Sequence, residues 1–306
     1  MQILYWFESI RNPVLDAIML ALTEFGGETA FLVAALICYW CVDKRKGYYL
    51  MAVGFIGTVA NQFLKIACRV PRPWVRDPHF TIVEAAREGA AGYSFPSGHS
   101  QTSVGTFGAI AMTAKKTWIR ITAIAVAVIV PITRMYLGVH TPADVLVGSA
   151  MALGLLILLE PLVFGKDGAY IPALFGAMSA LAVAFVIFAE VFPFPADIDP
   201  HNLASFEKNA YTLLGTMLGM TIVYFYDEKK LHFSTEATLA GQLAKVLGGL
   251  AVVLLVKEGM RAPLDAIFGG HLMARSIRYF LIVLVAGIAW PQAFPRLSQI
   301  GKKAEK

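Results

Sequence analysis

The sequence predicts an all-α fold, a polytopic transmembrane helical bundle with about nine spans and an N-terminal interfacial helix. Of the 306 residues, 57% are hydrophobic and only 15% are charged, whereas soluble domains carry about 25% charged residues. Several apolar stretches reach roughly 17 to 25 residues, the length that an α-helix needs to cross a bilayer. Strict alternation of apolar and polar residues is missing, which argues against an outer-membrane barrel.

Residues 1–26 differ from the rest of the chain because charged side chains interrupt their hydrophobicity. Pro13 is well placed to open a helix. We expect an amphipathic helix lying at the membrane interface, with a tenth, shallow crossing as the alternative. The N-terminus has neither a basic start nor a small-residue cleavage site, so we expect this segment to be retained.

Nine later apolar runs predict the membrane spans. They cover residues 28–42, 48–67, 100–115, 118–135, 143–164, 169–192, 210–226, 240–257 and 277–293. Cys38, Cys41 and Cys68 lie in or beside these runs, with no histidine at metal-ligand spacing. We therefore expect the cysteines to pack in helices rather than to form disulfides or bind metal.

Positive charge predicts the orientation of the bundle. The basic connections are 43–47, 115–120, 165–168 and 227–230, together with the tail 301–306. If the nine spans alternate, all of these fall on one side, which the positive-inside rule makes cytoplasmic. The opposite side receives connections 68–99, 138–144 and 194–202. Arg261, Arg275 and Arg278, near the last span, break this bias.

Three polar segments end or begin spans on the predicted extracytoplasmic side. They are Lys65 to Arg72-Pro73, then Pro96-Ser97-Gly98-His99, then Thr133-Arg134 to His140 and Asp144. Each has an ordinary explanation when taken alone. Cations at a helix end can snorkel, a histidine after a Pro-Ser-Gly turn can open a helix, and an acid suits a helix N-terminus. Chance makes a poor account of all three segments on one side of a membrane.

The combined pattern predicts a phosphate site. Three fixed cations, Lys65, Arg72 and Arg134, can surround a group with two negative charges, and arginine matches phosphate oxygens in pairs. The turn before residue 100 opens a helix whose first N–H groups lack internal partners. The backbone of Ser97, Gly98 and His99 can therefore donate to the same oxygens.

Two histidines in this pattern predict two chemical roles. Asp144 follows His140 by four residues, close enough to orient the ring and leave one nitrogen free as a nucleophile. His99 has no such partner in its own segment, and we expect it to protonate the departing oxygen. The sequence offers no acidic cluster for magnesium or zinc, so we expect neither a metal nor another cofactor.

At these residues the chain strongly resembles the type 2 phosphatidic acid phosphatase superfamily. The signature of that family is Lys, six residues, Arg-Pro; then Pro-Ser-Gly-His; then Ser-Arg, five residues, His, three residues, Asp. All three parts occur here in order, with Thr133 in place of the serine. The resemblance covers roughly residues 12–165. Soluble haloperoxidases that bind vanadate share these motifs, but the hydropathy of this chain argues against them.

The resemblance implies a metal-independent lipid phosphatase with a helical transmembrane core. It implies a phosphohistidine on His140, orientation of that ring by Asp144, and acid–base work by His99. It implies that six residues hold the phosphate: Lys65, Arg72, Ser97, Gly98, Thr133 and Arg134. Family substrates include phosphatidic acid, phosphatidylglycerophosphate, polyprenyl diphosphates, lipid A phosphates and sphingoid phosphates.

The remaining expectations concern the rest of the chain and its setting. We expect residues 1–165 to form the phosphatase core and residues 166–306 to add helices of unknown role. Lys257 and Arg261 form either a second anion site or, the more ordinary interpretation, interface contacts. We expect a bacterial cytoplasmic membrane, a site on its extracytoplasmic side, lipid phosphate substrates and membrane lipids as partners, and no nucleic acid. A lipid phosphotransferase and a phospholipid transporter remain alternatives, and the oligomeric state is open.

Overall fold

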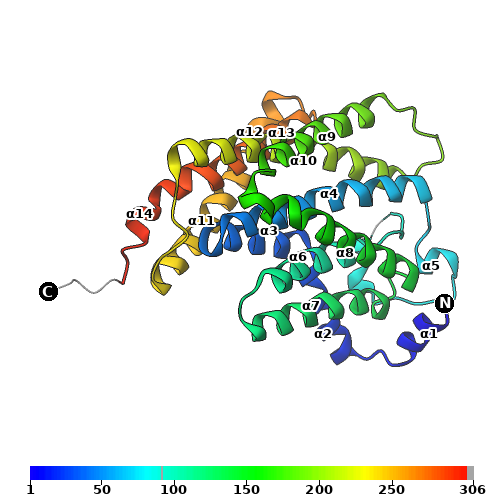
Figure 1. Cartoon of the computed structure of the whole chain (residues 1–306). Coiled ribbons are helices and arrows are strands. Elements are labelled where there is room, and N and C mark those ends of the chain that lie inside the picture. Colours follow the sequence, from blue (N-terminus) through cyan, green and yellow to red (C-terminus); the bar gives the residue numbers. More distant parts are fainter. Residues whose placement is uncertain (91, 302–306) are drawn as a thin grey trace. The chain divides into compact units, whose positions relative to one another are not determined.

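The computed structural model describes residues 1–90 and 92–301, and within these residues the regular structure is entirely helical (Figure 1). The α-helices are α1 (Gln2–Ser9), α2 (Pro13–Thr23), α3 (Glu28–Ile37), α4 (Lys44–Cys68), α5 (Pro73–Arg76), α6 (Gly98–Thr113), α7 (Thr117–Tyr136), α8 (Pro142–Phe164), α9 (Ile171–Val191), α10 (Pro200–Tyr226), α11 (Leu239–Gly259), α12 (Arg261–Ile267), α13 (Met273–Leu284) and α14 (Phe294–Leu297). Short 3₁₀ or π turns extend several of them, including η1 (Glu24–Gly26), η2 (Cys38–Val42) and η7 (Val285–Ala289). The all-α prediction is confirmed.

Polar side chains fix where several helices begin. Asn12 caps α2 by accepting from the Leu15 N–H at 3.0 Å, with Pro13 at the first helical position. Thr238 caps α11 in the same way. Such caps satisfy N–H groups that the first turn leaves without internal acceptors. Asp43 accepts from the N–H groups of residues 45 and 46, so the basic residues expected in a connection instead form the first turn of α4.

Among the described residues, six helical segments are long and apolar enough to cross a membrane, or seven if a bent pair counts as one span. The six are Lys44–Arg76, Thr117–Tyr136, Pro142–Gly168, Ile171–Val191, Leu239–Ile267 and Met273–Leu297. Every predicted span contains a helix, but a count of nine crossings is not confirmed. Helix α6 has 16 residues, which at about 1.5 Å per residue is shorter than the hydrocarbon core.

The N-terminal region contains two helices rather than the single one that was predicted. The chain leaves α1 at Ile10 and re-enters a helix at Pro13, after the Asn12 cap. Residues 13–26 and 28–42 form the bent pair, with an angle of 51° between its halves. The predicted single helix is therefore divided by the Asn12 cap, and its location at the membrane interface stays a prediction.

One compact unit of the chain comprises residues 1–35, 49–161 and 194–205. In it α6 and α7 run side by side, and α1 and α2 lie along α7 (Figure 1). Gly148 of α8 packs so closely on the start of α6 that a Cβ there would lie 2.5 Å from the Ser97 carbonyl oxygen. This packing brings the ends of α6, α7 and α8 together within the unit.

The second unit comprises residues 36–48, 162–193 and 206–306, with its description ending at Gly301. Gly215 and Gly219 of α10 pack against α13, where a Cβ on Gly215 would lie 1.9 Å from the Ser276 carbonyl oxygen. The absence of a side chain at these two glycines allows α10 and α13 to pack closely. The basic tail 302–306, used above to predict orientation, lies outside the described residues.

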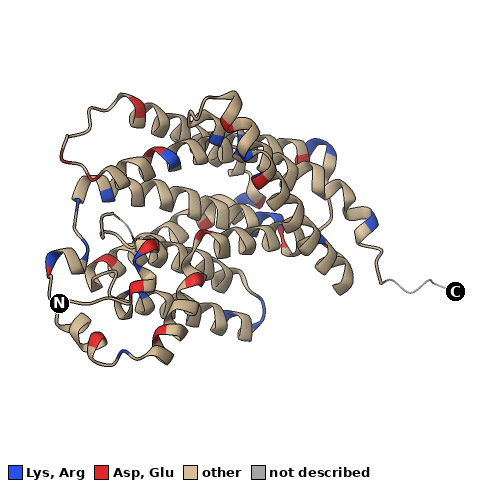
Figure 2. Ribbon diagram, turned by 180° about the vertical axis from the view of Figure 1, so that it is seen from behind, with Lys and Arg blue, Asp and Glu red and all other residues tan. Residues whose placement is uncertain are grey.

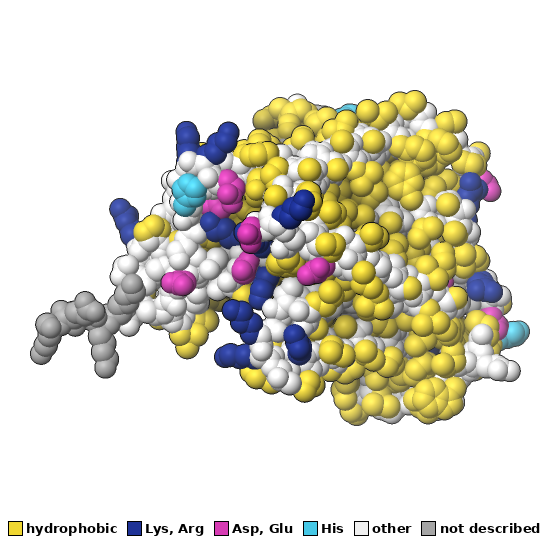
Figure 3. Space-filling view, in the orientation of Figure 1, with side chains coloured by type: hydrophobic (Ala, Val, Ile, Leu, Met, Phe, Trp, Pro, Cys, Tyr) yellow, Lys and Arg dark blue, Asp and Glu magenta, His cyan; other side chains and the backbone are white. Residues whose placement is uncertain are grey.

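The exposed faces of the long helices are apolar. In α8, Leu146, Ile157 and Leu158 are each at least 67% exposed, and in α11 Leu255 is 72% exposed. Hydrophobic side chains cover much of the visible helix surface (Figure 3), while many charged residues lie near helix ends and connections (Figure 2). Apolar side chains at this exposure suit contact with lipid. The chain is an integral membrane protein.

Candidate active site

The three polar segments predicted from the sequence meet in the first unit. Lys65 lies in the last turn of α4, and Arg72 directly precedes α5. His99 is in the first turn of α6, and Arg134 is in the last turn of α7. His140 occupies the short connection from α7 to α8, and Asp144 lies in the first turn of α8. Helix ends from four parts of the chain therefore supply one cluster.

Arg72 is the central contact of this cluster. Its side chain is buried, and its Nε donates to the Gly92 carbonyl oxygen at 3.0 Å. One terminal nitrogen donates to the Val139 carbonyl oxygen at 2.9 Å and lies 2.9 Å from His140 Nε2. Because a guanidinium can only donate, the Nε2 lone pair accepts this contact. In a neutral ring the proton then resides on Nδ1.

Asp144 lies on the Nδ1 side of the His140 ring. Its Oδ2 is 3.6 Å from Nδ1, longer than a direct hydrogen bond. The hydroxyl of Ser94 lies beside both groups: it donates to Asp144 Oδ2 at 2.5 Å and is 3.5 Å from His140 Nδ1. The Thr141 N–H donates to the same carboxylate oxygen at 2.7 Å. The predicted pair is thus brought together, with Ser94 as a third member that the sequence reasoning missed.

Burial lowers the pKa of His140 well below its ordinary value, and the positive charges of Arg72 and Arg134 lower it further. Lys65 and the His99 ring act in the same direction. The imidazole therefore stays neutral near pH 7, and Nε2 keeps a lone pair, which accepts from Arg72 in this structure.

Arg134 is 3% exposed, and one of its terminal nitrogens donates to the Thr23 hydroxyl at 2.9 Å. Its Nε is buried and has no hydrogen-bond acceptor within residues 1–90 and 92–301. A buried donor without an acceptor costs free energy, so it is a candidate contact for an anion. Thr23, at the end of α2, was not predicted, because nothing in the sequence pairs it with α7.

Thr133 is fully buried, and its hydroxyl donates to the Val130 carbonyl oxygen one turn earlier at 2.7 Å. The proton of this hydroxyl is therefore used within α7. Its oxygen retains the capacity to accept a hydrogen bond, but a phosphate oxygen needs a donor. The structure thus places Thr133 beside the site without directing its donor to a phosphate.

The start of α6 offers backbone donors to the cluster. Ser97 caps the helix, and its own N–H donates to the Asp144 carbonyl oxygen at 3.0 Å. The donors left for an anion are the N–H groups of Gly98 and His99, because they precede the first internal turn. An added Cβ on Gly98 would meet only Asn61 Oδ1, at 3.8 Å. This open space allows a ligand to approach the backbone closely.

Lys65 and His99 are the remaining members of the cluster around His140. The Lys65 ammonium donates to the Tyr93 carbonyl oxygen at 2.7 Å, and its side chain is half-buried. The packing of η1 fixes the His99 backbone, because a Cβ on Gly26 would lie 2.9 Å from the His99 carbonyl oxygen. We find no hydrogen bond from the His99 ring within the described part of the chain, which leaves this imidazole available to a ligand.

The buried charges of the cluster do not cancel. Arg72 and Arg134 are buried and Lys65 is half-buried, whereas Asp144 is the buried carboxylate of the cluster and the exposed Glu24 acts on Arg134, so these positive charges exceed the negative charges around them. A phosphate dianion would balance this excess, and the buried setting strengthens such an interaction relative to water.

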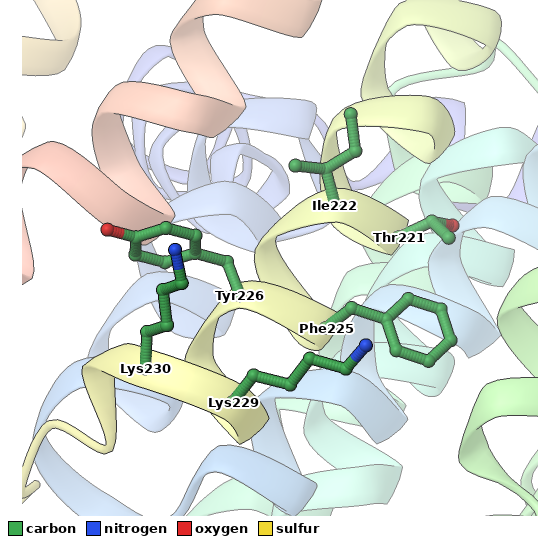
Figure 4. A pocket seen from close by; sticks show the side chains of 6 residues that line it. All are labelled: Thr221, Ile222, Phe225, Tyr226, Lys229 and Lys230. Atoms are coloured by element: carbon green, nitrogen blue, oxygen red, sulfur yellow. The ribbon is translucent and has the colours of Figure 1, made fainter.

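Two other features of the second unit, a groove and a pair of exposed cations, do not contain the combination of residues found in this cluster. Figure 4 shows an apolar groove of about 320 Å³, lined by Thr221, Ile222, Phe225, Tyr226, Lys229 and Lys230, without a histidine or a carboxylate. Lys257 and Arg261 are both exposed, at the end of α11 and the start of α12. Neither feature offers the buried nucleophile and donors found around His140.

Comparison with known proteins agrees with the motifs. The family model of the PAP2 superfamily matches residues 45–166, and that of the PAP2 superfamily phosphatase, transmembrane extension, matches residues 211–303. The first range contains every residue of the cluster named in the three motifs.

Curated relatives each resemble slightly less than half of the chain. Phosphatidylglycerophosphatase B of Bacillus subtilis strain 168 is 27% identical over 164 residues, which are 49% of this chain and 76% of the relative. Undecaprenyl-diphosphatase of Sulfolobus acidocaldarius is 29% identical over 136 residues, 44% of this chain and 64% of the relative. Undecaprenyl-diphosphatase BcrC of Bacillus subtilis strain 168 is 30% identical over 140 residues, 45% of this chain and 69% of the relative. No solved structure matches the chain. With the motif residues gathered around His140, two family matches, and a relative that is 30% identical over 69% of its length, the chain belongs to the PAP2 superfamily.

Proposed function

We propose that this chain is a membrane phosphatase that hydrolyses a lipid phosphate or diphosphate through a phosphohistidine on His140. The observation that carries the proposal is the setting of the His140 ring: Nε2 lies 2.9 Å from buried Arg72, and Nδ1 faces Asp144. A nucleophile held between a cationic phosphate contact and an orienting carboxylate is the arrangement that covalent phosphoryl transfer needs.

In the first step, the Arg72 donor moves from His140 Nε2 to an oxygen of the lipid phosphate, and the freed Nε2 attacks the phosphorus. The N–P bond forms as the bond from phosphorus to the lipid oxygen, or to the bridging oxygen of a diphosphate, breaks. Burial and the charges of the three cations lower the pKa of His99 to about 3, and the bound phosphate dianion offsets those charges and so favours the protonated ring. The protonated His99 gives its proton to the departing oxygen. Asp144 and Ser94 hold the ring and stabilise the positive charge that develops on it. Support for the last role comes from their contacts on the Nδ1 side.

In the second step, water attacks the phosphohistidine. His99, now neutral, accepts a proton from the water, the N–P bond breaks, and inorganic phosphate leaves with the added oxygen. Lys65, Arg72 and Arg134, with the N–H groups of Gly98 and His99, bind the phosphate oxygens in both steps. We place Ser97 as the cap of that helix turn, since its N–H donates to the Asp144 carbonyl oxygen, and Thr133 beside the site, since its hydroxyl donates to the Val130 carbonyl oxygen.

Charge on the phosphoryl group is stabilised by the three cations, and we propose that no metal ion takes part. Within residues 1–90 and 92–301, no group of three or more His, Cys, Asp and Glu side chains lies close enough to hold one. The relatives are phosphatidylglycerophosphatase and undecaprenyl-diphosphatases by name. We therefore propose a glycerophospholipid monophosphate or a polyprenyl diphosphate as the substrate class.

The test is phosphate release by purified protein in detergent with excess chelator. Phosphatidic acid, phosphatidylglycerophosphate and undecaprenyl diphosphate are each supplied as the only lipid, so that no lipid acceptor for phosphotransfer is added. We expect stoichiometric inorganic phosphate from at least one of them. Loss of activity in chelator that added metal restores would contradict the metal-free account. Absence of phosphate from all three would contradict the proposed function.

We further propose the predicted topology, with nine crossings, the core in residues 1–165, and the site at the extracytoplasmic face of a bacterial cytoplasmic membrane. Cys68 gives a natural reporter, because it is exposed at the end of α4, three residues after Lys65. A membrane-impermeant maleimide is expected to label it from outside spheroplasts, and Cys68→Ser should remove that label. Labelling of Cys68 only after lysis would contradict this orientation.

A further inference from the structure

We propose that the segment Phe194–Ser205 positions the phosphate-binding cations of the active site. This segment, referred to below as the connection, consists of the end of the loop from α9 and the first six residues of α10. The connection lies outside both family matches, which end at residue 166 and begin again at residue 211. It nevertheless belongs to the same compact unit as the catalytic cluster. The inference rests on the proposed function and adds to it a positioning element from the second half of the chain.

The contact runs through the two-residue corner Gly92–Tyr93. The Gly92 carbonyl oxygen accepts from Arg72 Nε at 3.0 Å, and the Tyr93 carbonyl oxygen accepts from Lys65 Nζ at 2.7 Å. Two consecutive carbonyl groups thus hold two of the three cations. Because a long cationic side chain has many rotamers, the position of its acceptor decides where its remaining donors point.

Residues of the connection contact the Gly92–Tyr93 corner directly. The Asp199 N–H donates to the Tyr93 hydroxyl oxygen at 3.0 Å. The amide of Asn202 lies against Gly92, where an added Cβ would be 2.3 Å from Asn202 Nδ2. Gly92 has φ of +74°, a conformation that glycine adopts without strain. Asn202 is 5% exposed, so this contact is a packed one rather than a surface encounter.

The connection is itself well anchored. Asp199 Oδ1 accepts from the Asn202 N–H at 2.8 Å and from Asn202 Nδ2 at 2.9 Å, which caps α10. Arg69 forms an ion pair with Asp197 at 3.0 Å, and the Arg69 N–H donates to the Lys65 carbonyl oxygen at 3.0 Å. The connection therefore reaches the Lys65 segment directly and the Arg72 segment through Gly92.

This arrangement predicts a specific kinetic effect. Removal of the Asn202 amide frees the Gly92–Tyr93 corner, and Arg72 and Lys65 lose their fixed direction without losing their charge. Phosphate affinity then falls more than the chemical step, because Asp144 and Ser94 still hold the Nδ1 side of the His140 ring. We therefore expect KM and the affinity for a phosphate analogue to change more than kcat.

The experiment compares full-length Asn202→Ala, Asp199→Ala and Asp199→Asn with the parent protein. Each is assayed with short-chain phosphatidic acid and inhibited with orthovanadate, an analogue of phosphoryl transfer. We expect the first two variants to raise KM and the orthovanadate inhibition constant about tenfold, the effect of losing contacts to charged groups, with kcat within about threefold of the parent. Asp199→Asn keeps an oxygen for the α10 cap and should restore both constants.

A thermal shift with and without orthovanadate serves as a readout independent of turnover. Asn202→Ala should unfold near the parent temperature in the absence of vanadate and gain less stability when vanadate is added. Asp167→Ala is the matched control, because Asp167 forms an exposed ion pair with Arg45 at 3.9 Å in the second unit. It should leave KM and the vanadate shift unchanged.

The outcomes separate the two proposals. If the parent hydrolyses lipid but Asn202→Ala and Asp199→Ala keep its KM and its vanadate shift, the positioning role is wrong and the proposed function stands. If the parent hydrolyses none of the lipids, the proposed function is wrong, and the vanadate shift still decides whether the connection positions an anion site. A parent that neither hydrolyses lipid nor binds vanadate overturns both.

Discussion

His140→Asn is expected to lower kcat at least about a thousandfold, because the variant removes the atom that forms the bond to phosphorus. Asparagine retains a polar side chain beside Arg72 but presents no ring nitrogen at the Nε2 position. Binding should survive, since the three cations and the α6 N–H donors remain. Orthovanadate protection in the thermal shift therefore accompanies the loss of turnover.

The matched control for this experiment is His79→Asn. His79 is exposed in the connection after α5, and no side-chain contact joins it to the cluster. This variant should keep kcat and KM within about twofold of the parent, as exposed substitutions usually do. Comparable activity of His140→Asn and His79→Asn would refute the nucleophile assignment.

Arg72→Lys is expected to lower kcat/KM about a hundredfold to a thousandfold, the usual effect of removing one preorganised donor from a charge-stabilising site. The guanidinium contacts Gly92, Val139 and His140 at once, with distances of 2.9 to 3.0 Å. Lysine keeps the positive charge but has one ammonium group, which cannot span three directions. The loss in kcat/KM therefore reports the missing donor geometry of the guanidinium rather than a missing positive charge.

Arg76→Lys provides the comparison at a nearby exposed arginine, at the end of α5. It should leave kcat/KM within about twofold of the parent, because the change conserves charge on an exposed side chain. An Arg72→Lys variant as active as Arg76→Lys would mean that the site needs only positive charge at residue 72. That result would remove Arg72 from the contacts that orient phosphate and His140.

Apolar run length predicted the long helices well. Helices α7 and α8 begin and end within one residue of the expected bounds, because a span needs an unbroken apolar stretch and its length is set by the bilayer. The predicted helix bounds were wrong where capping residues, rather than the apolar run, decide where a helix begins. Asp199 starts α10 ten residues before its apolar run, and Asn12 divides the N-terminal region.

Sequence spacing predicted contacts in the candidate site only where the contacting residues are close together in the chain. His140 and Asp144 are only four residues apart, and Asp144 lies in the first turn of α8, so the two residues must lie close together. Ser97 was placed correctly at the start of a helix. Ser94, Tyr93 and Thr23 could not be assigned, because their contacts join segments that lack periodicity and lie far apart in the chain. A sequence pattern specifies residue types at a site, whereas tertiary packing decides which hydrogen-bond donors remain unused.

The most direct measurement is a rapid quench of the parent enzyme during turnover of a lipid labelled with ³²P in its phosphoryl group. The account predicts a protein-bound label that survives alkali, is lost in mild acid, and maps to the peptide containing residue 140. His99→Asn should slow both its formation and its decay. A label on another residue, or steady turnover with no label at any quench time, would contradict a phosphohistidine at His140.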